Sequence, residues 1–221
     1  MSSRLDKLEI AVLFDLDGVI VDSREHHMAA WDAWAKIYAP RAPAGYFVAM
    51  FGRRNDAIIG GVLPDLTPER FEELAAHKER MFRDLARGSI AALPGVLGLL
   101  DALDDRTIPT AIVTSTPRAN LDLILESLGV ADRFDALVAE EDASKGKPDP
   151  EGFLVAAERL GVAPGRCVVI EDAPAGLQAA KAAGMRAIGV TTTHPAAALS
   201  DADLVVDSLA ETDILAFLLH S

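Results

Sequence analysis

Short apolar runs separate amphipathic stretches along most of this chain. The first run, Ile10 to Phe14, contains no polar residue, and such a run predicts a buried strand. Strands that alternate with helices ending at glycine predict an α/β fold, a Rossmann-like parallel sheet with helices on both faces. We expect strands at 10–14, 110–114, 136–139, 167–170, 186–190 and 203–206, and helices at about 95–104, 118–128, 150–160 and 175–183.

A block without any strand signal interrupts this alternation between residues 23 and 90. Residues 24–38 have the apolar spacing of an amphipathic helix, and short helical stretches are expected near 46–50 and 56–59. Thr67 and Pro68 are typical of an N-cap and a first helical position, and we expect that helix to run to about Ala86. The block predicts an all-helical domain, 23–91, inserted into an α/β core domain made of 1–22 and 92–221.

Composition limits the class of partner. The chain has 221 residues, 50% of them hydrophobic, and a formal net charge of -13. That charge argues against a nucleic-acid or membrane-surface binder, but it leaves room for an anionic substrate beside a metal ion. Cys167 is the single cysteine and excludes an internal disulfide. Neither a membrane-spanning apolar run nor a signal-peptide core is visible, so we expect a cytoplasmic protein.

Polar residues follow three of the predicted strands. Asp15 and Asp17 come directly after the first strand, and side chains two apart on an extended backbone share one face. Two carboxylates held that close require a cation or a shared proton. Gly18 then gives the backbone room to turn away.

Further polar groups are expected at the same edge of the sheet, because ligands of open parallel sheets bind outside the carboxyl ends of the strands. These groups are Thr114-Ser115-Thr116, Glu171-Asp172 and Lys145-Gly146-Lys147-Pro148. Each has a plain structural alternative: a helix N-cap, a solvated acidic pair, an exposed turn. Their convergence predicts a carboxylate-rich metal site, with one cation and hydroxyl donors around a small anion.

Four segments, in this order, resemble the four motifs of the haloacid dehalogenase superfamily. They are Asp15-Leu16-Asp17-Gly18-Val19-Ile20, Ser115, Lys147-Pro148 and Glu171-Asp172. The helical insertion after the first motif resembles the helical C1-type cap of that superfamily. Dehalogenases proper lack the second aspartate of the first motif, so Asp17 indicates the phosphotransfer branch.

The resemblance implies a role for each motif residue. Asp15 would be the nucleophile that forms an aspartyl-phosphate, and Asp17 the general acid and base. The implied cofactor is Mg²⁺, held by the carboxylates of Asp15 and Asp172, the backbone carbonyl of Asp17, and Glu171 directly or through water. Lys147, rather than Lys145, would hold a phosphoryl oxygen. Thr114 and Ser115 compete for the second-motif hydroxyl, and we favour Ser115 together with the Thr116 amide.

The inserted block is similar to the cap of the β-phosphoglucomutase-like subfamily. His27 and Lys78 match cap residues of that group, although an exposed histidine and a solvated lysine are the plain alternatives. Asn55 stands where the mutase has an arginine for the second phosphate of its substrate, and Arg53 or Arg54 can substitute for it. Arg118, just after the second motif, is a further candidate for contact with substrate.

The expected function is a Mg²⁺-dependent phosphatase of small phosphorylated metabolites, namely sugar or polyol phosphates. A β-phosphoglucomutase-type phosphomutase is the alternative, and a non-catalytic metabolite-binding or regulatory protein is the remote one. The expected assembly is a monomer or homodimer, with neither nucleic acid nor membrane as a partner. Residues 191–202 are expected to form a loop beside the site, and we assign no role to His194.

Overall fold

A computed structural model describes residues 10–50 and 53–219, so both ends of the expected core domain and residues 51–52 of the expected insertion lie outside the described residues. Within the described residues, six parallel strands form one sheet with the order β3-β2-β1-β4-β5-β6. The strands are β1 (Ala11–Phe14), β2 (Thr110–Val113), β3 (Ala136–Val138), β4 (Cys167–Glu171), β5 (Arg186–Val190) and β6 (Leu204–Val206). The predicted α/β fold is confirmed.

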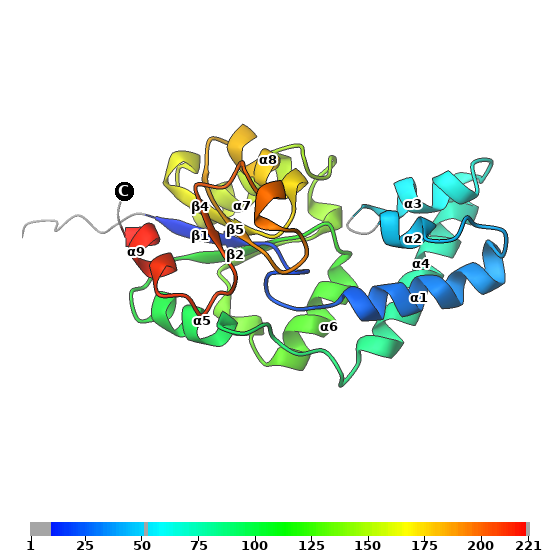
Figure 1. Ribbon diagram of the computed structural model, residues 1–221, viewed down its shortest axis with the longest axis horizontal. Coiled ribbons are helices and arrows are strands. Elements are labelled where there is room, and N and C mark those ends of the chain that lie inside the picture. Colours follow the sequence, from blue (N-terminus) through cyan, green and yellow to red (C-terminus); the bar gives the residue numbers. More distant parts are fainter. Residues whose placement is uncertain (1–9, 51–52, 220–221) are drawn as a thin grey trace, which may run out of the picture.

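Helices cover both faces of this sheet (Figure 1). Val12 and Phe14 of β1 lie in the apolar cluster beneath α5, α6 and α9, and the alternate residue Leu13 lies in the cluster beneath α7 and α8. These helices are α5 (Val96–Asp104), α6 (Arg118–Leu128), α7 (Glu151–Leu160), α8 (Pro174–Ala182) and α9 (Asp213–Leu219). Because β1 is buried on both faces, it has the continuous apolar sequence from which it was predicted.

The inserted helices lie at one end of the molecule, outside the sheet (Figure 1). They are α1 (Arg24–Tyr38), α2 (Tyr46–Ala49), α3 (Asn55–Val62) and α4 (Pro68–Ala86). One apolar cluster of the insertion contains Trp31, Trp34, Ile59 and Leu74. Phe82 belongs instead to the cluster beneath α5, α6 and α9. The last turns of α4 therefore join the insertion to the core.

The predicted bounds hold closely for the longer elements. Two helices have the predicted limits, 24–38 and 68–86, and the Thr67 side chain caps α4 by accepting from the Arg70 amide. Helix α9 was not predicted: its sequence is an apolar run without polar alternation, and tertiary burial of Ile214 and Leu218 stabilises it. Short 3-10 turns were also not predicted, at η1 (Ala131–Arg133), η2 (Glu140–Asp142), η3 (Pro164–Arg166) and η4 (Ala196–Ala198). None of the described helices is both long and apolar enough to span a bilayer.

The packing of α5 gives a stability prediction. Leu100 is fully buried, whereas Leu97 on the same helix is 48% exposed. Leu100→Ala should lower the free energy of unfolding by about 2–5 kcal/mol, because it leaves a cavity in the core. Leu97→Ala should change it by less than about 0.5 kcal/mol. Urea denaturation of both variants measures the difference, and equal losses would contradict the described packing.

Candidate active site

The carboxyl ends of neighbouring strands bring the motif residues together. Strand β1 lies between β2 and β4, and the Asp15 amide continues the ladder by donating to the Ile170 carbonyl at 3.0 Å. Asp15 follows β1, Ser115 follows β2 after one residue, and Glu171 is the last residue of β4. The central position of β1 explains why residues from three distant segments meet at one edge.

Three carboxylates form the centre of the site. Asp15, Glu171 and Asp172 each offer an oxygen, and these oxygens lie within 4.8 Å of one another. Two glycines leave room for them: a Cβ at Gly18 would collide with the Asp172 carboxylate, and one at Gly176 with the Glu171 carboxylate. Burial and the neighbouring negative charges raise the pKa values of Glu171 and Asp172. A hard, oxygen-only donor set of this kind fits a divalent cation.

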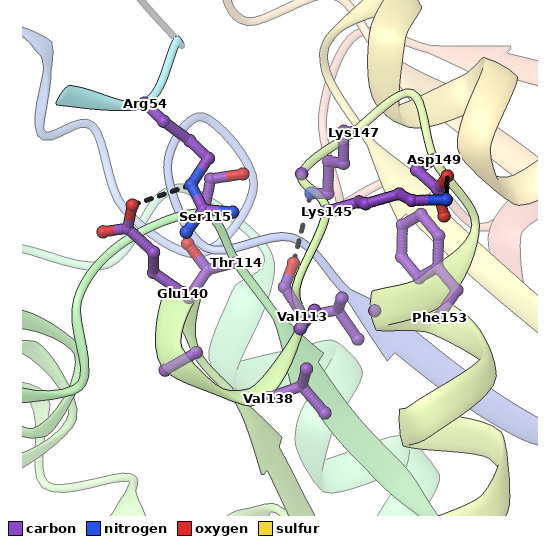
Figure 2. Close-up of a pocket in the computed structure, with 14 residues that line it drawn as sticks. Arg54, Val113, Thr114, Ser115, Val138, Glu140, Lys145, Lys147, Asp149 and Phe153 are labelled. Carbon is purple, nitrogen blue, oxygen red and sulfur yellow. Dashed lines mark hydrogen bonds and ion pairs between the residues drawn. The ribbon is translucent and has the colours of Figure 1, made fainter. Parts of the chain in front are cut away.

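Lys147 provides the positive charge beside these carboxylates. Its Nζ lies 2.7 Å from Asp15 Oδ1 and donates to Glu171. The same Nζ is 3.1 Å from the Val113 carbonyl oxygen (Figure 2). Burial opposes its charge, but Asp15 and Glu171 more than offset this and hold the pKa of Lys147 above its usual value. Lys145 reaches instead toward Asp149, with 3.3 Å between Nζ and Oδ2. The geometry therefore favours Lys147 over Lys145.

Asp17 has partners different from those of Asp15. Its carboxylate accepts a hydrogen bond from Ser23 on Oδ1 and one of 2.7 Å from the Thr116 hydroxyl on Oδ2. Burial and the charge of Asp15 raise the pKa of Asp17, and the two hydroxyl donors oppose the increase. Asp15 and Asp17, which were expected side by side, thus have different surroundings. Asp15 belongs to the carboxylate cluster, and Asp17 is held by the hydroxyls of Ser23 and Thr116, which we call the hydroxyl cradle.

The turn after β2 differs in detail from the expectation. The Thr116 amide, expected to meet a phosphoryl oxygen, donates to the Thr114 hydroxyl at 3.1 Å. Thr114 continues the strand ladder through its amide, which donates to Val138. Within the part of the chain that the structure describes, the Ser115 hydroxyl makes no hydrogen bond, and Ser115 lines a cavity shared by the sheet edge and the insertion. The Ser115 hydroxyl can therefore still donate a hydrogen bond to a bound phosphoryl group, whereas the Thr116 hydroxyl already donates to Asp17.

His27 and Lys78 approach the hydroxyl cradle from the helical insertion. The His27 ring stacks on Phe82, and its Nδ1 lies 2.8 Å from Lys78 Nζ. Burial, followed by the nearby Lys78 charge, lowers the pKa of His27, so the ring is neutral. Because the ammonium can only donate, Nδ1 is the acceptor and Nε2 carries the proton. Nε2 lies 3.9 Å from Asp17 Oδ1.

Glu79 is a buried carboxylate that the sequence did not single out. It accepts from Lys78 at 2.9 Å and Asn55 at 2.8 Å within the insertion, and from Asn120 of α6 at 2.5 Å. Arg83 extends the network with a 2.7 Å hydrogen bond to Asn120. A glutamate on an amphipathic helix is normally solvated, so only the contact between α4 and α6 distinguishes this one.

The predicted arginines divide between two locations. Arg54 lines the cavity, and its Nε lies 2.7 Å from Glu140 Oε1 (Figure 2). Arg118 is not among the residues that line the cavity: its guanidinium lies 3.9 Å from Asp142. The structure therefore does not bring Arg118 together with the other predicted site residues.

The loop after β5 contributes two residues. Thr193 donates to the Asp172 carboxylate, and His194 Nδ1 lies 3.0 Å from the Asp172 carbonyl oxygen. Both residues line the cavity, which agrees with the expectation of a loop beside the site. The sequence did not predict these contacts with Asp172, because Asp172 is 21 or 22 residues away along the chain.

One cavity of about 630 Å³ is lined by residues of both the core and the insertion. It contains Asp15, Asp17, Lys147, Glu171 and Asp172 at the sheet edge, and His27, Arg53, Arg54, Asn55, Lys78 and Glu79 from the insertion. This volume suits a small metabolite. The arrangement can bind a small anion beside a cation and exchange protons at Asp17.

Comparisons with known proteins agree with this geometry. The model of the haloacid dehalogenase-like hydrolase family matches residues 11–184. The chain is 37% identical to a β-phosphoglucomutase of Bacillus subtilis, over 95% of this chain and 93% of the relative. It is 35% identical to hexitol phosphatase A of Escherichia coli, over 91% and 92%. A crystal structure of a β-phosphoglucomutase from Clostridium difficile superimposes with a TM-score of 0.82 at 29% identity, covering 94% of this chain and 96% of that one.

The carboxylate cluster gives a prediction for metal binding. Because the folded pKa values of Glu171 and Asp172 are raised, the metal-free fold holds protons that the unfolded chain has released, and its stability should fall as pH rises through these values. A divalent cation binds the deprotonated carboxylates. Added Mg²⁺ should therefore raise Tm more at pH 8 than at pH 5.5.

Thermal unfolding with Mg²⁺ or with EDTA measures this effect. Asp172→Asn should remove most of the increase in Tm, whereas Asp132→Asn, at an exposed carboxylate in η1, should keep it. An increase that is the same at both pH values, or that survives Asp172→Asn, would contradict the assignment of the cluster.

Proposed function

The chain belongs to the haloacid dehalogenase-like hydrolase family, and we propose that it is a Mg²⁺-dependent phosphatase of small phosphorylated metabolites, sugar or polyol phosphates. The observation that carries the proposal is the different surroundings of two aspartates in one cavity. Asp15 lies in the carboxylate cluster against Lys147, whereas Asp17 is held by two hydroxyls and has a raised pKa. The surroundings of Asp15 suit nucleophilic attack on phosphorus, and those of Asp17 suit proton transfer.

Asp15 is the proposed nucleophile. Its Oδ1 is held by Lys147, which orients the carboxylate and also offers positive charge to a phosphoryl oxygen. The Ser115 hydroxyl can donate to a second phosphoryl oxygen. Asp15, Glu171 and Asp172, with the backbone carbonyl of Asp17, would hold Mg²⁺, which when bound neutralises part of the charge on the phosphoryl group. The oxygen of Asp15 forms a bond to phosphorus as the bond to the leaving oxygen breaks.

Asp17 is the proposed acid and base. Its raised pKa favours the protonated carboxyl that can give its proton to the leaving alkoxide. The carboxylate that remains can then take a proton from the water that attacks the aspartyl-phosphate. Ser23 and Thr116 direct the carboxyl group, and neutral His27 lies beside it. Proton transfer in both half-reactions therefore uses one side chain.

Residues 23–91 form the proposed cap domain, over a core domain made of 1–22 and 92–221. His27, Asn55 and Lys78 place polar groups on the cap side of the cavity, where the leaving group would lie. Exclusion of water by the cap would favour transfer to a sugar hydroxyl instead of hydrolysis. The 37% identity to a β-phosphoglucomutase makes a phosphomutase the second candidate.

Phosphate release from a panel of sugar and polyol phosphates, with and without Mg²⁺, tests the proposed activity. Addition of glucose 1,6-bisphosphate to β-glucose 1-phosphate tests the second candidate. Metal-dependent phosphate release supports the phosphatase, and formation of glucose 6-phosphate in excess of released phosphate supports the mutase. If the chain catalyses neither reaction, both the phosphatase proposal and the phosphomutase proposal are wrong.

Asp15→Asn should abolish turnover, because an amide is too weak a nucleophile to form the acyl-phosphate. We expect kcat to fall by about 10⁴-fold or more, the scale on which enzymes lose activity when a nucleophile is removed. Circular dichroism should show an unchanged fold, and Mg²⁺ should bind more weakly. Phosphate release at the wild-type rate would contradict the role of Asp15.

Thr116→Val should lower kcat by about tenfold with little change in KM, because the lost hydrogen bond holds the acid rather than the substrate. Thr116→Ser keeps the hydroxyl and should restore most of the rate. A rise in KM with an unchanged kcat would contradict this role, because it would mean that the Thr116 hydroxyl contacts the substrate instead of positioning Asp17.

A further inference from the structure

The two buried or half-buried cations on the cap side of the cavity each have a carboxylate partner. Arg54 Nε lies 2.7 Å from Glu140 Oε1, and their side chains are 28% and 19% exposed. Lys78 Nζ lies 2.9 Å from Glu79 Oε1, and these side chains are 3% and 7% exposed. All four residues line the cavity. This side of the cavity therefore presents paired charges rather than free positive charge.

Glu140 matters because of where it lies. It belongs to η2 of the core, whereas Arg54 is the residue before α3 of the insertion, so the ion pair links the core to the insertion (Figure 2). Low exposure limits the screening of this pair by water. An anionic group entering beside Arg54 must displace Glu140 or lie against its negative charge. Either costs binding free energy for a ligand with a second phosphate.

Lys78 cannot replace Arg54 as an anion site in this arrangement. Its ammonium lies over the Trp31 ring at 4.9 Å and already has His27 and Glu79 as hydrogen-bond partners. Binding of a phosphate there would break a network that also includes Asn55 and Asn120. Glu79 would keep the amide donors of Asn55 and Asn120 but would lose the ammonium that pairs with its charge, and breaking a buried ion pair is costly.

Arg53 is the remaining cap-side cation at the cavity. It is exposed, and Asp56 lines the same wall. Exposed ions are strongly screened and contribute little to binding. Asn55 lies between them in the sequence, and with its Nδ2 committed to Glu79 it retains a carbonyl oxygen that can accept from a hydroxyl. The cap side thus suits hydroxyl groups better than a second anion.

We propose that Glu140 is a specificity-determining residue: by pairing with Arg54, it restricts the cavity to monophosphate esters whose leaving group is uncharged and bears hydroxyls. This inference rests on the proposed phosphatase function and narrows its substrate class. Bisphosphates are poor substrates because their second phosphate meets a neutralised arginine and an adjacent carboxylate.

Two matched substrate pairs test the inference: fructose 1-phosphate with fructose 1,6-bisphosphate, and glucose 1-phosphate with glucose 1,6-bisphosphate. The measured quantity is the ratio of kcat/KM for the bisphosphate to kcat/KM for the monophosphate. The wild-type ratio should be below one. Glu140→Gln should raise it about tenfold, the scale of one charge-assisted hydrogen bond gained by the second phosphate.

Two further variants isolate the cause. Glu141→Gln makes the same charge change one residue away, at a side chain that accepts from the Arg118 amide and does not line the cavity, so it should leave the ratio unchanged. The double variant Arg54→Gln with Glu140→Gln should return the ratio to the wild-type value, because the released arginine is gone. Glu140→Ala serves as a second variant if Glu140→Gln unfolds.

Several outcomes would overturn the inference: a wild-type ratio above one, an equal gain in Glu141→Gln, or an equal gain for both members of a substrate pair. The last would show that Arg54 acts on the reacting phosphoryl group. Calorimetric binding of the same pairs to the Asp15→Asn variants of wild type and Glu140→Gln gives a readout without turnover. If the wild type hydrolyses no monophosphate, the proposed function fails, and the binding ratio still decides the role of Glu140.

Discussion

The contact of Lys147 with Asp15 and Glu171 is the interaction on which the site depends. Asp15, Glu171 and Asp172 meet at one sheet edge, and their mutual repulsion would be severe without a cation. A single ammonium donates to two of them and also to the Val113 carbonyl at the end of β2. Lys147 thereby ties the loop before α7 to three strand ends. What remains is excess negative charge, which a divalent cation is suited to balance.

Asp15 and Asp17 have different neighbours although only one residue separates them. Strand β1 ends at Phe14, and the chain then forms a tight turn in which Gly18 has a positive φ and Asp17 forms an isolated parallel bridge with Val21. Asp15 belongs to the carboxylate cluster, whereas the Asp17 carboxylate accepts from the hydroxyls of two other segments, Ser23 and Thr116. Two carboxyl groups two residues apart thus acquire distinct chemical environments, which is the condition for distinct roles.

The helical insertion is joined to the core by polar contacts as well as by packing. Glu79 binds Asn120 of α6, Arg54 binds Glu140, and Phe82 packs beneath the sheet. Glu79, Arg54 and Glu140 also line the cavity, so the same charged side chains hold the insertion against the core and set the charge on the cap side of the cavity. In our proposal, this charge pairing also selects the ligands that bind there.

Local sequence patterns were enough to predict the helices, the strands and the polar residues at the strand ends. Periodicity over ten to twenty residues is a local property, so α1, α4 and the buried strands were predicted with close bounds, and parallel topology implied that Asp15, Ser115, Lys147, Glu171 and Asp172 would converge. The partners of the remaining polar groups depend instead on how the helices pack against one another and against the sheet. Arg54 and Glu140 are separated by 86 residues, Thr116 and Asp17 by 99, and Glu79 and Asn120 by 41. A hydrogen bond depends on two ångström-scale positions set by packing between helices and sheet, and no local pattern of residues carries that information.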